Sequence, residues 1–127
     1  MIIVLLDTLL PGDDAFPAGG LLPGVPERLA SVAAPVLAAL PAGFAELPPD
    51  AREAALRGVE TSEPAAFERL LAAAYLAYYT APAVQAALLR THGYPARPPQ
   101  PDGHDLPPFD ETLLARQRQR APFWRKA

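Results

Sequence analysis

The two histidines, His92 and His104, come nearest in type and spacing to a metal-binding or catalytic set. They stand twelve residues apart in a proline-rich stretch that also carries Asp102 and Asp105. Imidazole nitrogens and carboxylate oxygens bind divalent metals, so a small metal-dependent enzyme that uses this stretch is one hypothesis. The closely spaced histidine pair typical of helical zinc sites is missing, and we therefore favour solvated loop residues.

Nucleophilic and phosphate-binding patterns are weaker still. Ser31 and Ser62 have no nearby histidine and acid, and Ser62 is placed to cap the following helix. Asp13 and Asp14 are adjacent carboxylates without a third ligand at a suitable spacing, which predicts a turn. The chain has no cysteine and no glycine-rich phosphate-binding pattern. We expect no catalytic residue in this chain, and no metal or cofactor bound by it.

Composition narrows the partner classes. The chain has 127 residues, which is enough for one domain with one core, and its 17 prolines separate short apolar runs. With a net charge of −3, the chain lacks the positive electrostatic potential that attracts nucleic acid, so no nucleic-acid partner is expected. Residues 70–89 carry no charge, but Pro82 and Gln85 interrupt them, so we expect no membrane insertion.

The predicted fold class is all-α. We expect a single small domain over 1–127, with five or six short helices around a buried central helix and long proline-rich loops. The central helix is Pro64 to Tyr79, capped by Ser62; from Leu70 onward it is apolar or tyrosine, which predicts enclosure by other elements. The further helices are expected at 2–10, 26–40, 50–57, 81–90 and 109–119, and the loops at 11–26 and 91–108.

A partner-binding surface is expected at the periphery. The tail 116–127 is basic and aromatic, and Arg116 and Arg120 should share a helical face. From the residues alone, a solvated helix is the favoured interpretation of this basic run, and docking to a partner is the competing one. Tyr75, Tyr78 and Tyr79 form a patch on one helical face. We favour a role for this patch in the core, and a binding site is the second interpretation. The candidate partner-binding residues are Tyr78, Tyr79, Tyr94, Arg116, Arg120, Phe123, Trp124 and Arg125.

Four short motifs follow one another along the chain: LDTLLPGDD at 6–14, AYLAYYTAPAV at 74–84, Gly93-Tyr94-Pro95, and Leu113-Leu114 leading into 118–125. In this order they resemble one known family, the gluconate 2-dehydrogenase subunit 3 family. The likeness covers most of the chain, and the two tyrosines followed by proline and then Gly-Tyr contribute most to it.

This resemblance implies a helical accessory subunit that binds a large flavin-dependent sugar or sugar-acid dehydrogenase of the glucose-methanol-choline (GMC) oxidoreductase type. The FAD and the chemistry would then belong to the partner. Family members often carry a twin-arginine export signal, and this chain begins directly at its first predicted helix. We expect a cytoplasmic location, or a periplasmic one if the signal is missing from this sequence or supplied by the partner. A self-associating helical module is the other hypothesis.

Overall fold

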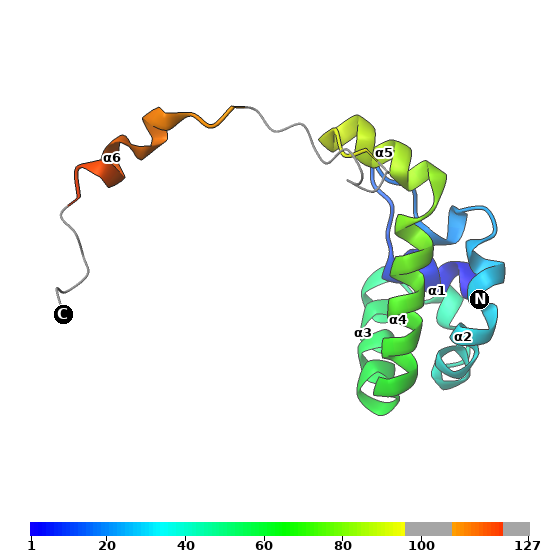
Figure 1. Ribbon diagram of the computed structural model, residues 1–127. Helices are drawn as coiled ribbons and strands as arrows, with labels where there is room; N and C mark the ends of the chain where they lie inside the picture. The colour runs from blue at the N-terminus through cyan, green and yellow to red at the C-terminus, as the bar shows by residue number, and fades with distance from the viewer. Residues whose placement is uncertain (96–107, 121–127) are drawn as a thin grey trace. The chain divides into compact units, whose positions relative to one another are not determined.

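The computed structural model describes residues 1–95 and 108–120, and all regular structure in these ranges is helical, as predicted (Figure 1). Contacts divide the chain into two compact units, Met1–Ala96 and Arg97–Ala127. Every buried side chain among the described residues belongs to the first unit. The single domain predicted over 1–127 stays a prediction.

Prolines mark the beginnings of the longest helices. Pro49, Pro64 and Pro82 each occupy the first position of a helix, where the missing N–H has no intrahelical partner to lose. The described elements are α1 (Ile2–Leu9), η1 (Gly19–Leu21), α2 (Val25–Ala39), η2 (Phe44–Glu46), α3 (Pro49–Ser62), α4 (Pro64–Tyr79), α5 (Pro82–His92), η3 (Glu111–Leu114) and α6 (Ala115–Arg118).

The α4 helix is central to the first unit, as predicted. It contacts α2, α3 and α5, and Figure 1 shows α3 running beside it and α5 turning away from its carboxyl end. Its side chains enter two apolar clusters: Leu70 packs with Val36 and Phe44, whereas Tyr78 packs with Val84. One helix therefore supports both halves of the core.

The prediction that α4 is enclosed on all sides was wrong. Its buried residues recur at helical spacing on one side: Ala66, Phe67, Leu70, Ala74, Ala77 and Tyr78. The neighbouring helices cover that side and leave Tyr75, Leu76 and Tyr79 exposed. Within the described ranges, no helix is both long enough and apolar enough to cross a bilayer.

The junction between α3 and α4 also differs from the prediction. The α3 helix passes through Gly58 and ends at Ser62, whose hydroxyl donates to the Val59 carbonyl oxygen at 3.4 Å instead of capping α4. Glycine inside a helix costs about 1 kcal/mol, and burying an apolar side chain contributes about 1.5–3 kcal/mol. Val59 is buried beyond the glycine, and its burial favours the longer helix.

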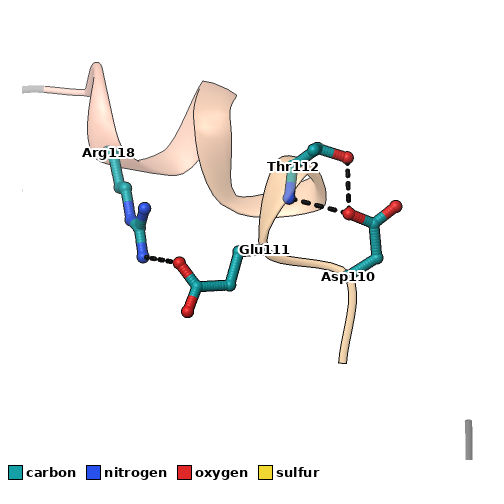
Figure 2. Close-up of polar contacts among 4 residues, drawn as sticks. All are labelled: Asp110, Glu111, Thr112 and Arg118. Atoms are coloured by element: carbon teal, nitrogen blue, oxygen red, sulfur yellow. Dashed lines mark hydrogen bonds and ion pairs between the residues drawn. The ribbon is translucent and has the colours of Figure 1, made fainter. Parts of the chain in front are cut away.

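In the described part of the second unit, residues 108–120, two short helical turns replace the one helix predicted over 109–119. The Asp110 carboxylate accepts hydrogen bonds from the Thr112 N–H at 2.9 Å and from the Thr112 hydroxyl at 2.7 Å (Figure 2). These bonds lower the pKa of Asp110. Arg118 also pairs with Glu111 at 3.1 Å. Because α6 ends at Arg118, the helical face predicted for Arg116 with Arg120 does not form, although both side chains are exposed.

Candidate functional site

The tyrosine patch predicted on α4 is divided between core and surface. Tyr78 is only 6% exposed, and its hydroxyl donates a hydrogen bond of 2.9 Å to the Pro17 carbonyl oxygen. Its ring and the Tyr79 ring form a T-shaped pair, perpendicular to each other with centroids 5.3 Å apart. Burial, followed by the nearby Tyr79 and the Asp13 charge, raises the pKa of Tyr78. Tyr78 is therefore a core residue, and its hydroxyl already has a partner.

Tyr75, Leu76 and Tyr79 are the large apolar side chains that α4 exposes, and we call them the α4 stripe. Their exposed fractions are 45%, 69% and 53%, and the rings of Tyr75 and Tyr79 lie 6.4 Å apart. The stripe has no charged side chain, because the charges of α4 are confined to Glu68 and Arg69 nearer its amino end. Contiguous exposed apolar side chains of this kind are typical of interaction surfaces.

A hollow beside the stripe extends it towards α2. It has a volume of about 420 Å³, and Arg28 and Leu29 of α2 line it together with Leu76 and Thr80. Leu76 thus belongs both to the stripe and to the wall of the hollow. A side chain that contacts Leu76 from outside could therefore also enter the hollow.

The loop that follows α1 is held against the ends of α4 and α5. Asp13 Oδ1 accepts hydrogen bonds from the Ala15 and Phe16 N–H groups, both at 2.7 Å, and forms the turn predicted from sequence. The Phe16 ring stacks on the His92 ring with centroids 6.3 Å apart. Arg90 donates to the Ala15 carbonyl oxygen at 3.4 Å. Three chain segments therefore meet at this corner.

The corner forms a groove of about 370 Å³, which we call the Asp13 groove. Its polar and aromatic wall comes from the loop after α1, the last turn of α4 and the end of α5. Four rings and one carboxylate face a single recess, which is suited to binding an apolar or cationic group. The residues used below are Asp13, Phe16, Tyr78, Tyr79, Leu88 and His92.

A second hollow of about 370 Å³ is polar and lies between α1 and α3. Asp7 and Thr8 line it with Arg52 and Glu53. The Asp7 carboxylate accepts the Gly20 N–H at 2.8 Å, whereas Arg52 Nε is buried without a hydrogen-bond partner among the described residues. The Asp7 contact ties α1 to η1, and we assign this hollow no chemistry.

The histidine hypothesis is only partly covered by the described chain. His92 ends α5 and is exposed, whereas His104, Asp102 and Asp105 lie outside the described residues. Among residues 1–95 and 108–120, no three His, Asp or Glu side chains gather closely enough to hold a metal ion. The structure does bring His92 to Phe16, a neighbour that the sequence did not indicate.

The predicted partner-binding residues have separate positions. Tyr79 and Tyr94 are exposed in the first unit, as docking requires, and Arg116 and Arg120 are exposed in the second. Phe123, Trp124 and Arg125 lie outside the described residues. Sequence reasoning missed Leu76, Asp13 and Phe16 as surface candidates. For Phe16 a signal existed, namely an aromatic residue in a loop of turn formers.

Comparisons of the chain with protein-family models, with curated proteins and with solved structures found no match. Because no related protein indicates a site, the structural part of the functional inference rests on the α4 stripe and the Asp13 groove.

Proposed function

We propose that this chain is a non-catalytic accessory subunit that binds and stabilises, or matures, a large flavin-dependent sugar or sugar-acid dehydrogenase. The exposed α4 stripe is the observation that supports a docking role. The class of partner comes from the resemblance of the chain's short motifs to the gluconate 2-dehydrogenase subunit 3 family. On this proposal the FAD and the reacting groups belong to the GMC-type partner.

The composition of the stripe suits the centre of a protein interface. Interface centres are depleted in charge and enriched in tyrosine, and a few buried aromatic anchors supply most of the binding energy. Tyr75 and Tyr79 provide two such anchors with Leu76 between them. The adjoining hollow at Leu29 and Thr80 provides a recess for a complementary side chain.

The opposite side of α4 holds the stripe in place. Leu70 and Ala74 are fully buried there, and Tyr78 adds its hydrogen bond to Pro17. A surface that is already ordered loses little conformational entropy on binding, so more of the contact energy remains as affinity. A rigid helix with one buried side and one apolar exposed side therefore favours docking to a folded protein.

Co-expression tests the proposal directly. The chain would be produced together with a flavin-dependent dehydrogenase of the GMC type from the same organism, captured through a tag on this chain, and separated by size exclusion with flavin absorbance recorded. We expect both chains to co-elute with flavin at micromolar concentration. Independent elution, with a dehydrogenase that folds and retains its flavin without this chain, would contradict the proposal.

Light scattering on the isolated chain separates the alternative of self-association. A homodimer that dissociates when Leu76→Glu is introduced, together with no affinity for the flavoprotein, would assign the stripe to a second copy of the chain. A monomer under the same conditions leaves the stripe free for a different protein.

A further inference from the structure

The first unit has an excess of negative charge that bears on what can approach the Asp13 groove. Residues 1–95 contain ten Asp and Glu against five Arg. Opposite charge favours encounter and orientation of a partner more than it adds raw affinity. A cationic group is therefore favoured at this surface over an anionic one.

Asp13 presents the negative charge of the groove itself. Oδ1 accepts both turn hydrogen bonds, and Oδ2 accepts none from the described residues. No Lys or Arg of the described chain forms an ion pair with Asp13. Arg90 bonds the neighbouring Ala15 carbonyl oxygen and does not line the groove. The carboxylate is thus available to a cation that enters from outside.

The rings of the groove favour a cation of a particular shape. Phe16, Tyr79 and His92 line the recess beside Asp13. A guanidinium group is planar, stacks on aromatic faces and donates several hydrogen bonds, whereas an ammonium group is compact and more strongly hydrated. Leu88, in the same wall, can cover the methylene stem of a long side chain. These features together fit arginine better than lysine.

We propose that the Asp13 groove receives an arginine side chain of the partner protein, with its guanidinium at the free Asp13 oxygen and against the aromatic wall. Tyr79 belongs both to this groove and to the α4 stripe, so one partner would cover both. The inference deepens the proposed function and rests on it for the identity of the partner. The chemistry of the groove can be tested without that partner.

The first arm uses the full chain and a small probe. N-acetyl-arginine methylamide would be titrated against it by NMR, with the citrulline derivative as the neutral probe of the same shape. We expect saturable shifts of the Phe16, Tyr79 and His92 ring protons with arginine at millimolar concentration. Binding of citrulline should be about threefold to tenfold weaker, as loss of an exposed ion pair and a cation–π contact implies. Equal binding of the two probes would overturn the inference.

A pair of matched variants locates the charge. Asp13→Asn keeps an Oδ1 acceptor for the turn and removes the charge, whereas Asp14→Asn removes a neighbouring exposed charge that does not line the groove. The first should weaken arginine binding by about threefold to tenfold, and the second should leave it unchanged within about twofold. An equal loss in both variants would indicate a diffuse field instead of a site.

The second arm repeats the co-purification with these two variants. We expect Asp13→Asn to release the dehydrogenase at a lower salt concentration than Asp14→Asn. If no flavoprotein binds the native chain, the proposed function fails and the probe titration still decides the chemistry of the groove. If the complex forms equally with both variants, the accessory role stands and the arginine inference is overturned.

Discussion

The hydroxyl of Tyr78 donates a hydrogen bond of 2.9 Å to the carbonyl oxygen of Pro17, which lies 61 positions earlier in the chain. This bond joins the carboxyl end of α4 to the loop that forms the Asp13 groove. It also turns one tyrosine of a three-tyrosine patch inward and leaves the next, Tyr79, facing the groove and the surface. The position of a single hydroxyl therefore connects the core to both candidate surfaces.

Removing that hydroxyl should weaken the fold without affecting the α4 stripe. We expect Tyr78→Phe to lower the free energy of unfolding by about 1 kcal/mol, the usual net contribution of a neutral hydrogen bond. Urea denaturation followed by circular dichroism measures the change. The control is Tyr79→Phe, an exposed neighbour that should stay within about 0.5 kcal/mol of the native chain. If both variants lost the same free energy of unfolding, the loss could not be assigned to the hydrogen bond with Pro17.

The raised pKa of Tyr78 predicts a loss of stability in alkali. The unfolded chain releases this proton near the ordinary value of 10.0, whereas the folded chain holds it to a higher pH because the phenol is buried. The stabilisation is complete below about pH 10 and declines as the pH rises through the folded pKa, because the unfolded state then binds fewer protons. Urea unfolding between about pH 9 and 11 should show a steeper decline for the native chain than for Tyr78→Phe. Parallel declines would refute this assignment.

Two glycines should respond in opposite directions to the same substitution. A Cβ at Gly20 would lie 2.5 Å from the Ile3 carbonyl oxygen and 2.7 Å from Asp7 Oδ1, so Gly20→Ala should destabilise by about 2 kcal/mol. Gly58 lies inside α3 with nothing within 4 Å of such a Cβ, and Gly58→Ala should stabilise by about 0.5 to 1 kcal/mol. Thermal unfolding distinguishes the two. If Gly20→Ala unfolded at the same temperature as the native chain, α1 and η1 would be able to move apart at little cost, and the predicted clash would be refuted.

A charge introduced into the stripe should disrupt the proposed complex. Leu76 and Leu21 are exposed to similar extents, 69% and 72%, but only Leu76 belongs to the α4 stripe. We expect Leu76→Glu to raise the dissociation constant for the flavoprotein at least about 30-fold, the effect of losing a central interface contact. Leu21→Glu should change it by less than about twofold, and both variants should unfold as the native chain does. Calorimetry measures the affinity. Equal binding by the two variants would remove the stripe from the interface.

The sequence was informative where local chemistry decides the backbone. A helix accepts proline without losing a hydrogen bond only in its first turn. Pro64 and Pro82 therefore predicted the beginnings of α4 and α5 correctly. The Asp13 turn was predicted for a similar reason, since a short carboxylate bonds the N–H groups of the residues that follow it. Interactions over a few residues explain both.

The sequence was less informative where the free energy of a local capping preference is small compared with that of burying an apolar side chain. The helix predicted over 50–57 was expected to end before Gly58, and Ser62 was expected to cap the next helix. The observed α3 continues because Val59 reaches the core, and Ser62 becomes its last residue. Each local preference is worth about 1 kcal/mol, which burial of one apolar side chain can exceed.

By itself, the sequence determined that this chain folds into short helices separated by proline turns, with α4 among its neighbours and a turn at Asp13. Only the tertiary structure decided which side of α4 faces solvent, which tyrosine enters the core, and that Asp13 and Phe16 lie beside Tyr79 and His92. The physical reason is that a helix apolar on every side has no periodic pattern to indicate its buried face. Contacts with distant segments such as Pro17 then make the choice.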